Sequence, residues 1–256
     1  MNFLDIAKAW IQQDPDSQTK TELEKLVQSE NLSELAARFA TRLQFGTAGL
    51  RGELGAGPNR MNRVVVGWAA LALARFLQNN RAAYLDSNQE LSVVIGFDGR
   101  HNSDVFAKDT AEILAGAGIK AMLFDQMVPT PVAAFTGRAF RSSATVVVTA
   151  SHNPPRDNGY KVYIGPVADG IDYAASQIIN PTDGFIASDI AAVTSLKSQP
   201  RGSEWTILGE EEVDEYIKRT SALAPRPSDI KIVYTAMHGV GYRIVKQLFD
   251  QVGFRF

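Results

Sequence analysis

The sequence predicts an α/β fold in which a largely parallel sheet carries helices on both faces, followed by the start of a second α/β domain. Short apolar runs at 91–97, 119–124 and 144–149 have the length of buried strands. Helical patterns separate these runs, which is typical of parallel βα units. The runs are apolar at nearly every position, so the strands should be buried on both faces.

Composition excludes several classes of protein. The 256 residues are 45% apolar and 21% charged, as in ordinary globular domains. The formal net charge of −2 argues against a nucleic-acid partner, and no apolar stretch approaches the roughly 20 residues that span a bilayer. The chain has no cysteine, which excludes disulfides and thiolate metal sites and favours a reducing compartment, the cytoplasm. Only three histidines argue against a zinc site built from several of them.

Residues 1–44 are expected to form an N-terminal helical arm that packs on the domain surface. Apolar residues recur there at helical spacing, and Asp14-Pro15 should end the first helix. Thr19-x-x-Glu22 is a capping-box pattern, which predicts the start of a second helix at Thr19.

The main domain is expected over residues 45–205. Its first segment, FGTAGLRGELGAGPNR at 45–60, contains five glycines and is expected to hold no regular element. Asn62 should cap a buried helix, and Pro131 should lie in the first turn of another. Two more elements are predicted, a helix over 103–117 and a strand over 160–164.

Residues 206–256 are expected to hold a linker helix and the incomplete start of a second domain. GEEEVDEYIKRTSALAP reads as an acidic helix ended by Pro225, and IKIVYTAMHGVG as a strand and turn leading into a helix near 242–251. The final VGFRF resembles the start of another strand. One βα unit cannot enclose a core, so the chain is predicted to be an N-terminal fragment or to be completed by a partner.

The loop that follows the third apolar run carries the most unusual residues. TVVVTASHNPPRDNGYK drives a strand directly into Ser151, His152 and two prolines. Loops after the strands of an α/β sheet are where ligands usually bind. His152 is adjacent to Ser151, and neighbouring side chains in extended backbone point opposite ways, which argues against a protease-like triad.

Phosphoryl transfer is the alternative chemistry for this loop. A phosphoserine carries about −1.5 to −2 charges at pH 7 and needs cations around it. The chain offers four such groups: Arg51, Arg100, His152 and Lys161. An unreactive polar turn is an equal alternative from the motif alone. A phosphatase with Asp98 as nucleophile is disfavoured, because Arg100 stands where such enzymes have a second acid. A sugar-phosphate-binding module without catalysis also stays open.

Four segments together resemble the α-D-phosphohexomutase superfamily, the phosphoglucomutases and phosphomannomutases. TASHNPPRDNGYK resembles the phosphoserine loop of this family, FGTAGLRG its arginine loop, IGFDGR its first-strand exit and TAMHGVG the opening of its second domain. The resemblance runs from about Phe45 to the end of the chain. The long spelling FGTAGLRGELGAGPNRMN is most similar to the branch that holds phosphoglucomutase 2 and phosphopentomutase.

The resemblance implies an isomerase that acts as an intramolecular phosphotransferase of carbohydrate metabolism. Such an enzyme interconverts sugar 1-phosphates and 6-phosphates, or pentose 1- and 5-phosphates, through a phosphoserine and a sugar bisphosphate, which also serves as activator. It implies one Mg²⁺ bound by a phosphoserine oxygen at Ser151 and by three aspartates of a DxDxDR loop, which this sequence lacks. The remaining domains of the full-length chain would supply those ligands and the sugar-recognition loop. The 256-residue chain alone is therefore expected to be inactive as a mutase, and the preferred sugar is left open.

The resemblance also implies roles for individual residues. Ser151 would carry the phosphoryl group, His152 would help to hold it, and Arg51 would reach it. Lys161 would act as general acid–base or as electrostatic support. Phosphate or substrate binding is expected of Thr47, Arg51, Asp98, Arg100 and Asn153, although an Asp98–Arg100 pair that merely orders its turn is an equal alternative. His101 is expected to face solvent, and His238 to belong to a structural turn.

Overall fold

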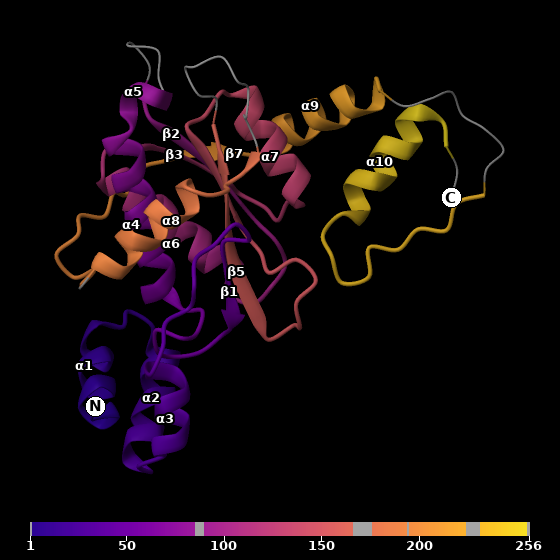
Figure 1. The fold of residues 1–256 in the computed structure, drawn as a ribbon. Helices are drawn as coiled ribbons and strands as arrows, with labels where there is room; N and C mark the ends of the chain where they lie inside the picture. Colours follow the sequence, from indigo (N-terminus) through magenta and orange to yellow (C-terminus); the bar gives the residue numbers. More distant parts are fainter. Residues whose placement is uncertain (1, 85–89, 166–175, 194, 224–230, 255–256) are drawn as a thin grey trace.

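The computed structural model describes residues 2–84, 90–165, 176–193, 195–223 and 231–254. Figure 1 shows one sheet with helices on both of its faces, the architecture that the sequence predicts. The strands are β1 Leu50–Glu53, β2 Ser92–Phe97, β3 Lys120–Phe124, β4 Ala144–Val148, β5 Asp157–Ile164, β6 Ser176–Gln177 and β7 Thr206–Leu208. The helices are α1 Phe3–Gln13, α2 Ser17–Gln28, α3 Leu32–Phe39, α4 Arg63–Asn79, α5 Arg81–Tyr84, α6 Ser103–Gly116, α7 Thr130–Ala139, α8 Thr182–Ala192, α9 Glu210–Ser221 and α10 Tyr242–Val252.

The sheet is mixed, with a parallel centre. Its strand order is β1-β5-β4-β2-β3-β7, and β6 pairs with β5. The four strands from β4 to β7 in this order are parallel, whereas β5 is antiparallel to β1, β4 and β6. The expectation of a mixed sheet covered by helices is confirmed.

Alternate side chains of the buried strands enter two cores. Val93 and Ile95 of β2 belong to the larger core, which includes the buried residues of α4 and α6. Val94 points to the opposite face and packs in the core of α7 and α9. A strand buried on both faces must be apolar at every position, which explains the continuous apolar runs of the sequence.

The N-terminal arm consists of three helices, α1 to α3. The first helix ends at Gln13, as Asp14-Pro15 predicts. The predicted start of the second at Thr19 is wrong by two residues: α2 begins at Ser17, because the Asp16 side chain caps it by accepting from the Gln18 N–H. The Thr19 hydroxyl instead donates to the Asp14 carboxylate over 2.8 Å.

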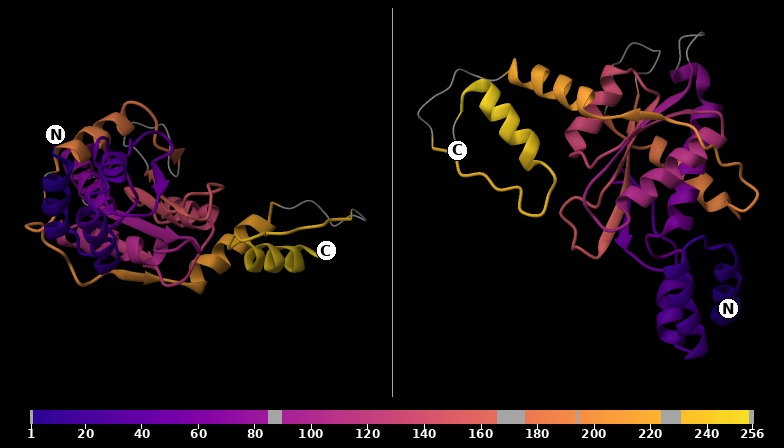
Figure 2. Two further views of the ribbon diagram at one scale, coloured as in Figure 1. Left: turned by 90° about the horizontal axis from the view of Figure 1, so that it is seen from below. Right: turned by 180° about the vertical axis from the view of Figure 1, so that it is seen from behind.

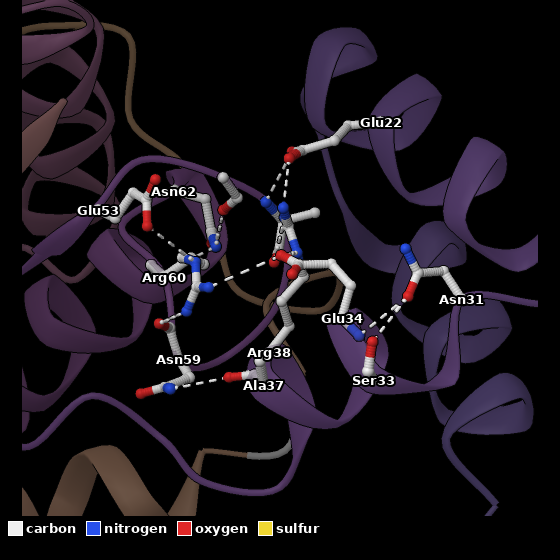
Figure 3. Close-up of polar contacts among 12 residues, drawn as sticks. Glu22, Asn31, Ser33, Glu34, Ala37, Arg38, Glu53, Asn59, Arg60 and Asn62 are labelled. Atoms are coloured by element: carbon white, nitrogen blue, oxygen red, sulfur yellow. Dashed lines mark hydrogen bonds and ion pairs between the residues drawn. The ribbon is translucent and has the colours of Figure 1, made fainter.

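Side chains of this arm, ordered by ion pairs with each other, bind the backbone of the glycine-rich segment (Figure 3). The largely buried Arg38 guanidinium lies 2.7 Å from the Glu22 carboxylate and 2.9 Å from Glu34. Arg38 also donates to the Ala56 carbonyl over 3.2 Å, while Glu22 accepts from the Ala56 N–H over 3.0 Å. Both backbone polar groups of Ala56, in the glycine-rich segment, are thus bound by the arm.

The expectation that residues 45–60 hold no regular element is wrong, because Leu50–Glu53 forms β1. The β5 strand offers a hydrogen-bonding edge, and pairing with it offsets the entropy that glycines lose on ordering. Gly49 makes the close approach possible. Its φ is +73°, and a Cβ there would lie 2.0 Å from the Tyr160 carbonyl oxygen.

The sheet extends past the predicted domain end at residue 205. Thr206–Leu208 forms β7, which pairs in parallel with β3. The strand β7, the helix α8 and the two-residue β6 are not predicted from the sequence. The division of the chain into residues 1–44, 45–205 and 206–256 stays a prediction.

The C-terminal segment differs from its prediction at two expected strands. Lys231–Ala236 forms no strand and Val233 is fully exposed, because no neighbouring strand in the described part of the chain pairs with it. The α10 helix forms as expected and contacts α9 (Figure 2). Val252 ends α10 and Gly253 caps it with a φ of +82°, so the predicted final strand does not begin there.

Figure 2 shows α9 and α10 at the end of the molecule opposite the N-terminal arm. Pro225, the predicted end of the acidic helix, lies outside the described residues, and α9 ends at Ser221. No described helix has both the length and the apolar character needed to cross a bilayer.

Asn62 provides a test of how the glycine-rich segment is ordered. Its side chain caps α4 by accepting from the Val65 N–H, and its amide nitrogen donates to the Gly55 and Gly57 carbonyls over 2.8 Å each. We expect Asn62→Ala to lower the free energy of unfolding by about 2–3 kcal/mol, because it removes a cap and the side-chain donor of the buried Gly55 carbonyl, while the Gly57 carbonyl keeps its bond from the Arg60 N–H. Urea denaturation measures this change.

Asn31→Ala is the matched control. Asn31 also caps its helix, α3, but it is exposed and its loss should cost only about 0.5–1 kcal/mol. Equal losses in the two variants would contradict the role assigned to Asn62.

Candidate active site

The β5 strand brings three segments of the candidate site together. Arg51 of β1 lies opposite Gly159 of β5, and Lys161 lies two residues further along the same strand. Because side chains alternate along a strand, Arg51 and Lys161 share a face of the sheet. The Thr149 N–H, just past the end of β4, donates to the Gly159 carbonyl over 3.0 Å.

Gly159 allows these three segments to approach closely. A Cβ at this position would lie 2.6 Å from the Thr149 carbonyl oxygen and 2.7 Å from that of Leu50. Both distances are shorter than any normal carbon–oxygen contact. The absence of a side chain at this position therefore sets the spacing between β1 and the segment leading to Ser151.

Ser151 is exposed at the start of the loop that joins β4 to β5. Its φ is +58°, the left-handed region that side chains other than glycine rarely adopt. Its N–H donates to the Thr149 hydroxyl over 2.9 Å, and its carbonyl accepts from Arg100 over 2.7 Å. A strained backbone of this kind persists only where surrounding contacts fix it.

Arg100 supplies most of those contacts. One terminal nitrogen of its guanidinium donates to the Pro154 and Asp157 carbonyls, both at 2.9 Å. The other donates to the Ser151 carbonyl at 2.7 Å and to that of Asn153 at 2.8 Å. The structure thus places Arg100 on the backbone of the loop.

Asp98 orders the turn that presents Arg100. One oxygen of its carboxylate accepts from the Ser103 hydroxyl over 2.9 Å and from the Arg100 N–H over 3.1 Å. Its other oxygen lies 3.5 Å from Arg100 Nε. Of the two alternatives for Asp98 and Arg100, this geometry supports the pair that orders the turn.

Lys161 is a cation held in an environment that disfavours its charge. It is only 9% exposed. Burial lowers the pKa of Lys161, the positive charge of Arg51 lowers it further, and the carboxylate of Asp98 partly opposes both. A lysine with a lowered pKa has more of the neutral form that accepts a proton.

Arg51 of β1 and Asn153 of the loop after β4 face each other. Arg51 Nη1 lies 3.5 Å from Asn153 Oδ1, and the buried Arg51 Nε has no hydrogen-bond partner among the described residues. Asn153 is oriented by donating from Nδ2 to Asp157 over 3.0 Å. Arg51 therefore retains donor capacity that Arg100 does not.

The predicted site residues His152 and Thr47 and the two other histidines are exposed. His152 is exposed beside Ser151, and the exposed Thr47 accepts a hydrogen bond at its carbonyl from Gln177. His101 is exposed, and its carbonyl accepts from Asn158 over 2.9 Å. His238 is exposed in the turn before α10.

Asn158 is a residue that the sequence analysis does not single out. It is fully buried, and its amide nitrogen donates to the His101 carbonyl and, over 3.0 Å, to the Ser103 hydroxyl. It joins the loop after β2 to the start of β5. Asn-Gly is an ordinary turn signal, so only its position inside the sheet reveals this role.

The described residues do not form a metal site by themselves. No group of three or more His, Asp or Glu side chains in the described part of the chain is placed to bind a metal ion. The carboxylate of Asp98 is already used by Ser103 and Arg100. Ser151 could contribute one oxygen, and the described residues do not complete a Mg²⁺ ligand set around it.

Comparison with known proteins identifies related chains. Residues 42–180, more than half of the chain, match the family model described as phosphoglucomutase/phosphomannomutase, alpha/beta/alpha domain I. A "Probable phosphomannomutase" of Haemophilus influenzae is 48% identical over 196 residues, which cover 75% of this chain and 38% of the relative. Human phosphopentomutase is 32% identical over 94% of this chain and 40% of its own length.

A third relative and a solved structure agree with these. A "Probable phosphoribomutase" of Schizosaccharomyces pombe is 34% identical over 97% of this chain and 42% of its own length. A phosphoglucomutase/phosphomannomutase family protein of Burkholderia thailandensis has the same fold, with a TM-score of 0.62 and 24% identity over 82% of this chain and 42% of that chain. The chain spans about two fifths of the length of the curated relatives it matches.

The pKa of Lys161 is open to direct test. We expect Arg51→Gln to raise it, because a neighbouring positive charge is removed, and Asp98→Asn to lower it, because a negative charge is removed. The Cε chemical shift of Lys161, followed through a pH titration by NMR, reports both changes. Shifts of the same sign in the two variants would contradict the arrangement of charges described above.

The backbone of Ser151 gives a second test. Glycine adopts positive φ without strain. The free energy of unfolding of Ser151→Gly, measured by urea denaturation, should therefore exceed that of Ser151→Ala by about 1 kcal/mol. Ser203 is exposed and has no positive φ, so its glycine variant should instead be the less stable of the pair. The same order at both positions would argue against strain at Ser151.

Proposed function

Because the chain belongs to the phosphoglucomutase/phosphomannomutase family, we propose that it carries the phosphoserine site of a sugar phosphomutase. The enzyme would interconvert sugar 1-phosphates and sugar 6-phosphates, or pentose 1- and 5-phosphates. The observation that carries this proposal is the exposed hydroxyl of Ser151, held on a fixed loop within the same cluster as Arg51 and Lys161.

The reaction proceeds through two phosphoryl transfers. The Oγ–P bond of phosphorylated Ser151 breaks, and a new O–P bond forms to the free hydroxyl of the sugar phosphate, which gives up its proton. The bisphosphate then turns and returns its other phosphoryl group to Ser151 Oγ, and the released sugar oxygen takes up a proton. A sugar bisphosphate supplies the first phosphoryl group and so acts as activator.

Arg51 and Lys161 have complementary roles in this proposal. The planar guanidinium of Arg51 binds phosphoryl oxygens in pairs, which suits a group that spreads negative charge in transit. The lowered pKa of Lys161 suits it to accept the proton of the sugar hydroxyl. His152, Thr47 and Asn153 are proposed to contact the phosphoryl group or substrate from the surrounding loops.

Other domains of the full-length protein complete the site in this proposal. The family is generally Mg²⁺-dependent. Bound Mg²⁺ would supply neutralisation of the negative charge that moves with the phosphoryl group. The described residues offer only the oxygen of Ser151 toward it, so the aspartate ligands and the sugar-recognition groups are assigned to the additional length that the curated relatives have.

The proposal also covers the class of sugar and the cellular compartment. The names of the relatives differ in the sugar, mannose in one and a pentose in others, so the proposal covers both hexose and pentose phosphates. A cytoplasmic location is proposed because the chain has no cysteine and its relatives bear the names of enzymes that act on sugar phosphates.

Phosphorylation of Ser151 tests this function. After incubation of the full-length protein with glucose 1,6-bisphosphate, we expect intact-mass analysis to show one added phosphoryl group, located on Ser151 by peptide mapping. Ser151→Ala should lose that phosphate and lower kcat/KM by roughly 10³-fold or more, as loss of a covalent nucleophile does. Ser203→Ala, which removes another exposed hydroxyl, should behave as the unaltered protein.

Two outcomes would contradict the proposal. Full mutase activity of Ser151→Ala would exclude a phosphoserine mechanism. Tight binding of sugar phosphates without phosphate on Ser151 and without turnover would instead indicate a binding module.

A further inference from the structure

We propose that Arg100 is a positioning residue that fixes Ser151 for phosphoryl transfer and does not itself bind the phosphoryl group. The inference rests on the proposed function and assigns Arg100 a role other than the phosphate binding that is one of the two alternatives from the sequence. The hydrogen-bond donors of its side chain support this role. A guanidinium has five N–H groups, and each must be directed at an acceptor to contribute a hydrogen bond.

Four of the five donors of Arg100 form hydrogen bonds with the loop, and the nitrogen that carries the fifth forms an ion pair. The four terminal N–H groups meet the four carbonyl oxygens of the loop, those of Ser151, Asn153, Pro154 and Asp157, at 2.7–2.9 Å. The fifth, on Nε, faces the Asp98 carboxylate at 3.5 Å. A phosphate oxygen could gain a donor from Arg100 only by displacing one of these acceptors.

The arrangement also explains why the loop can keep its shape. Four carbonyl oxygens within seven residues converge on one point, where their partial negative charges would repel each other without a cation. The hydrogen bonds from a charged donor are stronger than those between neutral groups. They hold the Ser151 peptide in its left-handed conformation, at a φ of +58°, which the residue would not adopt freely.

The two arginines of the site therefore differ in how many of their N–H donors are bound by the protein. Arg51 has one long contact, 3.5 Å to Asn153, and a buried Nε without a partner among the described residues, so it has donors to offer a ligand. The four terminal donors of Arg100 are all bound to the loop, and its Nε is paired with Asp98. Lysine cannot replace Arg100, because three donors on one nitrogen atom cannot reach four carbonyls that lie around a planar fork.

Arg100→Lys and Arg51→Lys form the matched pair that tests the inference. In the full-length protein we expect Arg100→Lys to lower kcat by roughly 10–100-fold, because small displacements of a reacting group cost rates of this order. Its KM for the sugar phosphate should stay within about twofold, since Arg100 does not touch the substrate. Hydrogen exchange of the amides in residues 150–157 should become faster in this variant and stay unchanged in Arg51→Lys.

Thr149→Val provides a second variant that acts on the same loop through a different contact. It removes the hydroxyl that accepts from the Ser151 N–H while keeping nearly the same shape. We expect the same pattern as for Arg100→Lys, with a smaller effect: kcat falls, KM is kept and exchange of the loop becomes faster. Circular dichroism and urea denaturation establish that both variants are folded.

The outcomes separate this inference from the proposed function. If Ser151 of the unaltered protein takes phosphate from glucose 1,6-bisphosphate, but Arg100→Lys raises KM at constant kcat, Arg100 binds phosphate and the inference is wrong. Unchanged exchange of residues 150–157 in Arg100→Lys would also overturn it. If Ser151 of the unaltered protein takes no phosphate, the proposed function fails, while the exchange measurement still decides whether Arg100 holds the loop.

Discussion

The antiparallel insertion of β5 between β1 and β4 is the constraint on which the site depends. The parallel strands β2 and β4 end on the same edge of the sheet, and a parallel neighbour would begin at the opposite edge. Because β5 runs the other way, its first residues lie beside the last residues of β4. Lys161 therefore lies near the loop that leaves β4, and β1 adds Arg51 from the other side. Arg51 and the loop after β4 are 102 residues apart at Asn153, yet they meet beside β5.

Charge is distributed unevenly over this edge of the sheet. Asp98 and Arg100 bind other groups of the protein, and their contacts fix a turn and a loop. Arg51 and Lys161 lie on one face of the sheet as neighbouring positive charges, and that proximity contributes to the lowered pKa of Lys161. A phosphoryl group between them would reduce their mutual repulsion. The cost of holding two cations together is thus largest when no anion is present, which favours ligands that bring negative charge.

Much of the fold could be predicted from the sequence, because strands buried on both faces leave continuous apolar runs. The strand β1 could not, since its glycines indicate a loop and only pairing with β5 makes it a strand. Residues 231–236 show the opposite error: their sequence pattern is typical of a strand, but they form none, because no strand in the described structure lies beside them. Strands of two or three residues, such as β6 and β7, are too short to leave a periodic signal.

The candidate site was predictable where chemistry resides in the side chain and not where it depends on the backbone. Ser151, Arg51 and Lys161 stand in family motifs, and the motifs point to them directly. The contacts of Arg100 join its side chain to carbonyl oxygens more than fifty residues away, and carbonyls are present at every position of a sequence. The buried bonds of Asn158 were hidden for the same reason.

Gly159 has a consequence for natural variation in such proteins. The carbonyl oxygens of Thr149 and Leu50 occupy the space that any side chain at this position would need. A single additional methyl group would push the two backbones apart, although it would meet no substrate and alter no charge. Selection on this position would therefore act through the distance between two main chains. A harmful allele could arise at a residue that has no reactive group but lies next to the candidate site.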